Sequence, residues 1–257
     1  MEPANERNLV GGTPPPDCSW SAHALFLDFD GTLAPIVSRP RDACLTEITR
    51  RLLVRLAAAT GGAIAILSGR ALTDLAERLE GLPLALSGCH GMEIRHSDKC
   101  IETSTPGDNA LDAAFGQLQP VATKHGLLIE RKPGSIALHY RNRPESADSC
   151  RSSVARAAAT RGLRALHGNM VSEAALAGVD KGRALRRFLR DAPFAGRLPV
   201  MIGDDATDED GFRVAQELGG FGLRIGSSDT VARYRVARMD DALAWLNQTL
   251  RTPPRRR

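Results

Sequence analysis

The sequence has little lysine, and its cysteines follow no pairing pattern. The five cysteines are odd in number, and no two are spaced as Cys-x-x-Cys, which argues against a disulfide framework or a zinc site and favours reduced thiols. Of the 34 lysines and arginines, only four are lysine: Lys99, Lys124, Lys132 and Lys181. Where arginine is the usual cation, a lysine can mark a position that needs a compact point charge.

The sequence also lacks an apolar run long enough to cross a membrane. Its first residues, through Thr13-Pro14-Pro15-Pro16, include acids and prolines but no apolar core, so we expect no signal peptide. Positive charge is spread along the chain except in Pro253-Pro254-Arg255-Arg256-Arg257, which we interpret as a solvated tail rather than a nucleic-acid-binding arm. We therefore expect a cytoplasmic protein that binds neither nucleic acid nor membrane, with a disordered lead at 1–20 and a basic tail at 251–257.

With 257 residues, 42% of them hydrophobic and 25% charged, the chain can form one large domain or two modest ones. Its most informative stretch is Leu25 to Leu33, an apolar run that ends in Asp28, Asp30, Gly31 and Thr32. Side chains alternate along a strand, so the two carboxylates would share one face, about 6–7 Å apart. Such paired oxygen ligands favour Mg²⁺ or Ca²⁺. An Asp-Gly hairpin turn is the alternative, but the run before it is apolar on both faces, as in a covered parallel sheet.

Polar residues also follow two later apolar strands. Ser68 comes directly after 63–67, and Asp204-Asp205 follow 198–202 after one glycine. Ligands of a doubly wound sheet bind at the carboxyl ends of its strands, so these residues could lie together; for Ser68 a helix N-cap remains the alternative. Thr207 and Asp210 fit a capping box, which leaves Asp204 and Asp205 unexplained. Lys181 follows a predicted N-cap, Asp180, where a cation is unfavourable unless an anion is near.

Between these segments the pattern changes. Residues 111–121 and 145–160 have helical periodicity, whereas 127–131, 135–140 and 163–166 are typical of strands. Helix, hairpin, helix, strand indicates an inserted α+β domain. Glu130 and Lys132 share a strand face there; such a pair is ordinarily solvated, but in a cleft between domains it could bind sugar hydroxyls.

The motifs carry a resemblance to a known superfamily. Asp28-Phe29-Asp30-Gly31-Thr32-Leu33, Ser68-Gly69-Arg70, Lys181 and Gly203-Asp204-Asp205-Ala206-Thr207-Asp208 resemble, in order, the four motifs of the haloacid dehalogenase (HAD) superfamily of phosphotransferases. More narrowly, the sequence is similar to the trehalose-6-phosphate phosphatase family over roughly 24–250. This similarity rests on Gly88-Cys89-His90-Gly91-Met92-Glu93, Glu130-Arg131-Lys132, His139-Tyr140-Arg141, Gly178-Val179-Asp180-Lys181-Gly182 and the Gly203 to Phe212 run.

The resemblance implies an α/β fold: a HAD-like Rossmannoid parallel-sheet core at 21–104 and 175–250, with an inserted α+β (C2-type) cap domain at 105–174. It also implies Mg²⁺-dependent hydrolysis of trehalose 6-phosphate through an aspartyl-phosphate. Asp28 would be the nucleophile, Asp30 the acid and base, and Lys181 and Ser68 would stabilise the phosphoryl oxygens. It further implies the Mg²⁺ ligands Asp28, Asp30 (by its backbone carbonyl) and Asp204. Asp205 and Asp208 would orient these ligands or the lysine. The implied substrate-binding residues are Arg70, His90, Glu93, Glu130 and Lys132.

The resemblance also implies a functional pairing with a trehalose-6-phosphate synthase. Two alternatives remain open at this stage. One is a phosphatase for another sugar phosphate or phosphorylated glycoside, because the core motifs determine phosphoryl chemistry while the cap determines the substrate. The other is a non-catalytic sugar-phosphate sensor or an accessory subunit of a trehalose-synthesising complex.

Overall fold

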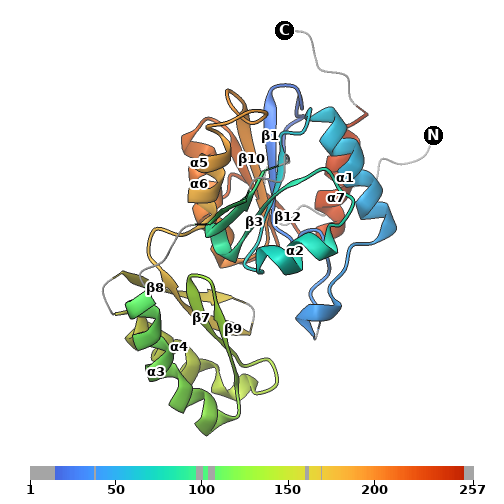
Figure 1. Cartoon of the computed structure of the whole chain (residues 1–257). Coiled ribbons are helices and arrows are strands. Elements are labelled where there is room, and N and C mark those ends of the chain that lie inside the picture. The colour runs from blue at the N-terminus through green and yellow to red at the C-terminus, as the bar shows by residue number, and fades with distance from the viewer. Residues whose placement is uncertain are drawn as a thin grey trace, which may run out of the picture.

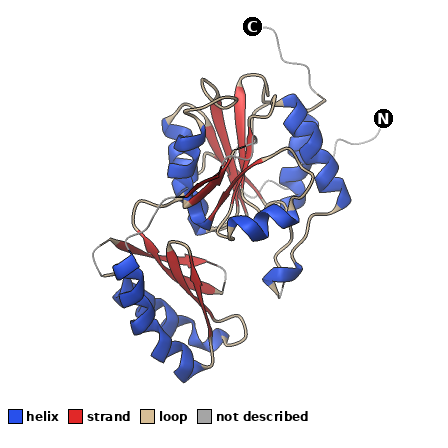
Figure 2. Ribbon diagram, viewed as in Figure 1, coloured by secondary structure: helices blue, strands red, loops and turns tan. Residues whose placement is uncertain are grey.

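A computed structural model describes residues 15–37, 39–96, 101–103, 108–159, 162–168 and 170–251. The chain forms two sheets, each packed against its own helices (Figures 1 and 2). Most of the N-terminal lead and nearly all of the basic tail lie outside the described residues. No described helix is both long and apolar enough to span a bilayer.

The larger sheet has eight strands in the order β12-β11-β10-β1-β2-β3-β4-β5. The first six of these pair in parallel, and β4 and β5 add an antiparallel edge. β1 lies in the middle, between β10 and β2. The strands are β1 (His23–Leu27), β2 (Ile64–Leu67), β3 (Ala85–Gly88), β4 (Glu93–Arg95), β5 (Ile101–Thr103), β10 (Leu198–Gly203), β11 (Phe221–Ile225) and β12 (Tyr234–Val236).

Both faces of this sheet are covered, which explains why β1 is apolar on both sides. On one face pack α1 (Glu47–Ala59), α2 (Leu72–Arg78) and α7 (Met239–Thr249), whose buried side chains include Leu53 and Trp245. On the other pack α5 (Lys181–Phe188) and α6 (Glu209–Glu217), around Phe26 and Phe188. Short 3-10 helices occur at η1 (Pro40–Asp42), η2 (Cys89–Gly91) and η4 (Ala206–Asp208).

The smaller sheet has four antiparallel strands in the order β6-β7-β9-β8. They are β6 (Leu128–Lys132), β7 (Ser135–His139), β8 (Leu163–Gly168) and β9 (Val171–Leu176). α3 (Asp108–His125) and α4 (Ala147–Ala158), the latter preceded by the 3-10 turn η3 (Pro144–Ser146), cover one face and enclose a separate apolar core that includes Leu118 and Val154. The uncovered face is turned toward the larger sheet (Figure 1).

The sequence-based interpretation missed two strands and misplaced one cap. β9 was not predicted, so the inserted segment has one strand more than helix, hairpin, helix, strand, and β12 was also missed. The capping box lies not at Thr207 and Asp210 but two residues earlier, between Asp205 and Asp208. The reason is that a 3-10 turn precedes α6, so that the chain becomes helical before the predicted N-cap.

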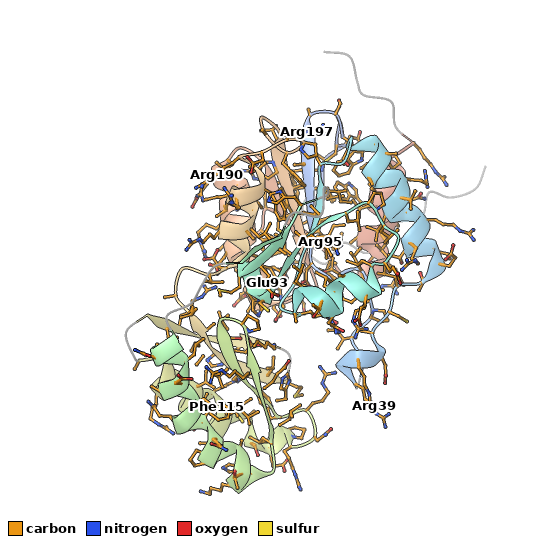
Figure 3. All side chains as sticks on the ribbon, viewed as in Figure 1. Arg39, Glu93, Arg95, Phe115, Arg190 and Arg197 are labelled. Atoms are coloured by element: carbon orange, nitrogen blue, oxygen red, sulfur yellow. The ribbon has the colours of Figure 1, made fainter. Side chains whose placement is uncertain are left out.

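The two ends of the larger sheet differ. At the amino ends of its strands, away from the smaller sheet (Figure 3), Arg197 donates hydrogen bonds to the carbonyls of Trp20 and Thr60 at 3.0 and 2.6 Å. The carboxyl ends face the smaller sheet, and Glu93 of β4 lies on that side (Figure 3). The chemistry-bearing residues are therefore gathered between the two sheets.

Candidate active site

Three carboxylates converge at the carboxyl ends of β1 and β10. These strands are neighbours, with Leu27 opposite Ile202, so Asp28 and Asp204 follow them at adjacent points. One oxygen each of Asp28, Asp204 and Asp208 lies within 4.8 Å of the others, and Asp28 and Asp208 are only 5% and 0% exposed. Burial, with further repulsion from Asp208, raises the pKa of Asp204 to about 7, as expected where acids crowd together without enough positive charge.

Lys181 bridges two of these acids. Its Nζ donates to Asp28 Oδ1 and to Asp208 Oδ1, both at 2.6 Å, and the residue is 2% exposed. Burial by itself lowers the pKa of Lys181, but the charges of Asp208 and Asp28 outweigh it, so the pKa is raised and the amine stays protonated. Burial raises the pKa of Asp28 in spite of Lys181, because Asp208 and Asp204 add negative charge. One lysine against three acids leaves room for a cation.

Asp204 has a carboxylate oxygen that is available to bind a metal ion. Its Oδ1 is buried and has no hydrogen-bond partner among the described residues. Asp208, in contrast, uses both oxygens, since Oδ1 accepts from Lys181 and Oδ2 accepts from the backbone N–H of Asp205 at 2.9 Å. Gly31 makes the approach of Asp204 possible: it has a φ of +81°, and a Cβ there would lie 2.1 Å from Asp204 Oδ2. The acidic cluster therefore fits a divalent cation held by oxygen ligands.

Ser68 and Thr32 place hydroxyls near these strand ends. Ser68 follows β2, is 1% exposed, and its Oγ accepts a hydrogen bond from the backbone N–H of Arg70 at 3.2 Å. It is not the N-cap of α2, a position taken by Ala71. The Oγ1 of Thr32 is buried with no partner among the residues described. Both hydroxyls can donate to an anion.

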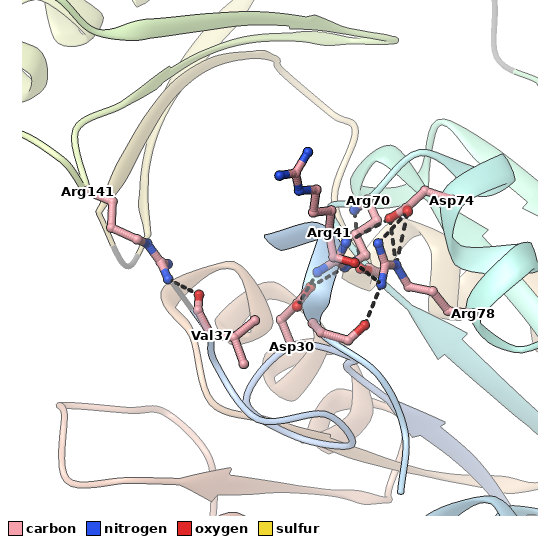
Figure 4. A network of polar contacts seen from close by, with 9 residues as sticks. Asp30, Val37, Arg41, Arg70, Asp74, Arg78 and Arg141 are labelled. Carbon is pink, nitrogen blue, oxygen red and sulfur yellow. Dashed lines mark hydrogen bonds and ion pairs between the residues drawn. The ribbon is translucent and has the colours of Figure 1, made fainter. Parts of the chain in front are cut away.

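Asp30 has an arginine as its partner. Its side chain is 39% exposed and forms a two-point ion pair with Arg70, whose Nε and Nη2 lie 2.7 and 2.6 Å from its oxygens (Figure 4). β1 ends at Leu27, so Asp28 and Asp30 both lie beyond the strand, and their sharing of one face stays a prediction.

A second polar cluster lies on the smaller sheet. Lys132 Nζ lies 2.8 Å from Glu173 Oε1 and 3.9 Å from Glu130 Oε2, and Glu130 also pairs with His139 at 2.8 Å. From the larger unit, His90 Nε2 reaches within 3.5 Å of Glu173 Oε2. The pKa of Lys132 is raised, because Glu173 and Glu130 outweigh the effect of burial. The structure thus brings His90, Glu130 and Lys132 into one cluster.

Glu173 was missed by sequence reasoning because β9 was missed. The residue is 5% exposed and also accepts a hydrogen bond from Ser135 at 3.0 Å. A signal was present, since Gly168-Asn169 between two alternating segments is typical of a tight hairpin. Glu93, which is predicted at the substrate, has one oxygen engaged in the core: its Oε2 accepts from the backbone N–H of Leu72 at 2.9 Å.

Several contacts join the two units around the site. Arg164 of β8 donates to Asp210 of α6 at 2.6 Å. Arg141, which follows β7, donates to the carbonyl of Val37 (Figure 4). A Cβ on Gly168 would lie 2.8 Å from Asp205 Oδ2. The smaller unit therefore lies directly over the strand ends that carry the acids.

A parallel α/β core whose strand ends carry acids, with an inserted α+β cap, defines the class of HAD-like phosphatases. A solved HAD-superfamily phosphatase from Bacteroides thetaiotaomicron has this fold, with a TM-score of 0.57 over 91% of this chain and 97% of that one at 15% identity. The C-terminal domain of Candida albicans trehalose-6-phosphate phosphatase fits better, with a TM-score of 0.82 over 91% and 93% of the two chains at 22% identity. At these identities the likeness concerns the fold.

Sequence comparison identifies the family. The trehalose-phosphatase family profile matches residues 26–241. The trehalose-6-phosphate phosphatase of Escherichia coli strain K12 is 36% identical over 236 residues, which cover 91% of this chain and 88% of that protein. The chain belongs to the trehalose-phosphatase family of HAD phosphatases.

Proposed function

We propose that the protein is a Mg²⁺-dependent phosphatase that hydrolyses trehalose 6-phosphate to trehalose and phosphate in the biosynthesis of trehalose. Family membership supports the activity. The observation that carries the chemistry is the buried Lys181, which bridges Asp28 and Asp208 beside Asp204. This arrangement provides a nucleophile, a fixed positive charge and ligands for a cation at one point.

In the proposed reaction the Asp28 carboxylate attacks phosphorus, and the bond from phosphorus to the sugar oxygen breaks as Asp30 gives that oxygen its proton. Water then attacks the aspartyl-phosphate and gives a proton to Asp30, which releases phosphate and restores Asp28. Lys181 and Ser68 donate hydrogen bonds to the phosphoryl oxygens. Positioning and charge neutralisation supply most of the acceleration of phosphoryl transfer.

Asp28 and Asp204 would hold Mg²⁺ through their carboxylates and Asp30 through its backbone carbonyl. When bound, the ion would neutralise charge on the acids and on the phosphoryl group. The unpartnered Oδ1 of Asp204 supports its assignment, whereas the two engaged oxygens of Asp208 favour a role in orienting Lys181 and the Asp205 backbone.

We assign sugar recognition to the polar cluster of the smaller sheet, and we propose that residues 105–174 form a cap domain on a core of 21–104 and 175–250. Glu130 and Lys132 would bind hydroxyls, with His90 and Arg70 contributing from the core. Glu93 would act through Oε1, since Oε2 is engaged with Leu72. We add Glu173, because it joins Lys132 to His90. The substrate must come from a reaction that forms trehalose 6-phosphate, so we expect functional pairing with a trehalose-6-phosphate synthase in the cytoplasm.

The first test is phosphate release from trehalose 6-phosphate, glucose 6-phosphate and sucrose 6-phosphate, each with Mg²⁺ and with chelator. We expect selective, Mg²⁺-dependent release from the first. Asp28→Asn should abolish release while keeping the fold, and Glu130→Ala should remove turnover of trehalose 6-phosphate but keep turnover of a small aryl phosphate. The exposed Glu145→Gln is the matched control.

Other outcomes would identify the alternatives. Release from a different sugar phosphate would keep the core chemistry and reject the assignment of the cap cluster. No release from any of the three, together with binding of trehalose 6-phosphate, would favour the sensor. Substantial turnover by Asp28→Asn would exclude Asp28 as nucleophile.

A further inference from the structure

A series of ion pairs extends from Asp30 to α2 (Figure 4). Arg70 donates to both oxygens of Asp30 and, through Nη1, to Asp74 Oδ2 at 2.8 Å. Arg78 in turn donates to both oxygens of Asp74, at distances of 2.7 to 3.0 Å. Positive and negative side chains thus alternate without a break over four residues: Asp30, Arg70, Asp74 and Arg78.

The far end of this series is tied to the backbone. Arg78 Nη1 donates to the carbonyl of Arg41 at 3.2 Å and to that of Ala43. Asp74 and Arg78 lie four residues apart on α2, on one face of the helix. The series therefore connects the segment around η1, through one helix face, to Asp30.

Arg70 is fixed from three sides. Asp30 and Asp74 hold its donor groups, and its guanidinium lies over the Phe29 ring, 5.4 Å from the centroid. Its side chain is 11% exposed. Asp30 itself lies beyond the end of β1 and is 39% exposed, so its orientation depends on this guanidinium rather than on strand geometry.

We propose that Asp74 and Arg78 are positioning residues for the phosphatase reaction, which hold the Asp30 carboxyl through Arg70 in the orientation needed for proton transfer to the departing sugar oxygen. The inference rests on the proposed function, in which Asp30 is the acid. Proton transfer tolerates little misplacement of the acid. A substitution at Asp74, two ion pairs away from Asp30, should therefore lower the rate of the reaction. A purely structural role on α2 would instead lower stability without regard to the substrate.

The test compares kcat/KM on trehalose 6-phosphate and on p-nitrophenyl phosphate for the unmodified protein, Asp74→Asn, Asp74→Ala and Arg78→Met. This parameter covers the steps up to departure of the leaving group. A sugar alkoxide needs a proton to leave, whereas nitrophenolate does not. For Asp74→Ala we expect a loss of about 10- to 100-fold on the sugar phosphate and under about 3-fold on the aryl phosphate.

Two controls separate positioning from stability. Glu77→Gln changes an exposed acid on the same helix and should leave kcat/KM on both substrates unchanged. In an Asp30→Asn background, Asp74→Ala should add no further loss on trehalose 6-phosphate, because both changes act on one group. Thermal unfolding checks that each variant folds, and Asp74→Asn, which keeps the side-chain size, replaces Asp74→Ala if the latter does not.

Equal losses on both substrates, or losses that add fully to those of Asp30→Asn, would overturn the inference. So would unchanged kinetics of the Asp74 variants in a protein that turns over trehalose 6-phosphate, which would leave the proposed function intact. Absence of that turnover in the unmodified protein would reject the proposed function and this inference with it.

Discussion

At the scale of single residues, two of the four lysines lie at the centre of buried ion networks. Lys181 is 2% exposed between Asp28 and Asp208, and the Lys132 side chain is 13% exposed beside Glu173. An ammonium group fits such a point because it is compact and its three donors can be aimed at several acceptors. The scarcity of lysine in the sequence thus indicated where to look, although it named no partner.

The ion pairing of Glu173 can be tested through the pH dependence of stability. Burial by itself would raise its pKa, but Lys132 and His90 outweigh burial and hold the pKa well below its ordinary value of 4.5. A carboxyl with a depressed pKa in the folded state stabilises the protein above the unfolded pKa, and this contribution is lost as the pH falls through the folded value. The difference in free energy of unfolding between the unmodified protein and Glu173→Gln should therefore be largest near neutral pH and shrink below about pH 4.

Urea denaturation at several pH values measures this difference. Glu145→Gln, at an exposed position, is the control and should show little dependence on pH. A difference for Glu173→Gln that stays constant from neutral to acidic pH would contradict the ion-pair assignment.

At the scale of single elements, the start of α5 positions Lys181. Asp180 caps this helix, since its side chain accepts from the backbone N–H of Arg183 at 2.7 Å. The sequence predicted this cap, and the structure confirms it. The carboxylate also offsets the unfavourable position of a cation at a helix N-terminus, so one local motif supports both the helix and the buried Lys181.

We expect Asp180→Ala to lower the free energy of unfolding by about 1 kcal/mol, the usual effect of losing an N-cap. Asp180→Asn keeps an oxygen acceptor and should recover most of that loss. Chemical denaturation measures both. Equal destabilisation by alanine and asparagine would show that the charge of Asp180, rather than its hydrogen bond, stabilises the helix start.

At the scale of the whole molecule, the position of the smaller unit depends on a few polar contacts with the larger one. Asp210 shows this clearly: one oxygen accepts from Arg164 across the boundary at 2.6 Å, and the other accepts from Arg213 within α6 at 3.0 Å. The sequence suggested that Asp210 caps a helix, whereas the fold uses it to join the two units.

We expect Arg164→Ala to reduce kcat/KM on trehalose 6-phosphate by about two- to fivefold, the effect of losing one partly exposed ion pair that holds the smaller unit against the larger one. Small-angle scattering should show a larger mean radius of gyration. Arg213→Ala removes the other partner of Asp210 without crossing the boundary and should leave both measurements unchanged. Equal effects of the two variants would mean that Arg164 does not act by holding the units together.

The sequence by itself determined the polar ends of the parallel strands and the inserted α+β unit. Apolar runs that end in Asp28, Ser68 and Asp204 predicted a parallel sheet with chemistry at one edge, because the pattern of burial is local to each strand. The N-cap at Asp180 is local for the same reason. A feature that depends only on residues close in sequence, such as a strand pattern or a helix cap, can be predicted from those residues alone.

Only the tertiary structure decided which side chains meet. The bridge of Lys181 between Asp28 and Asp208 spans 153 and 27 residues of sequence, and the contact between Lys132 and Glu173 spans 41. The Asp30 carboxylate pairs with Arg70, which lies 40 residues further along the chain. Such partners depend on strand order and on the packing of one unit against the other, which no local pattern encodes.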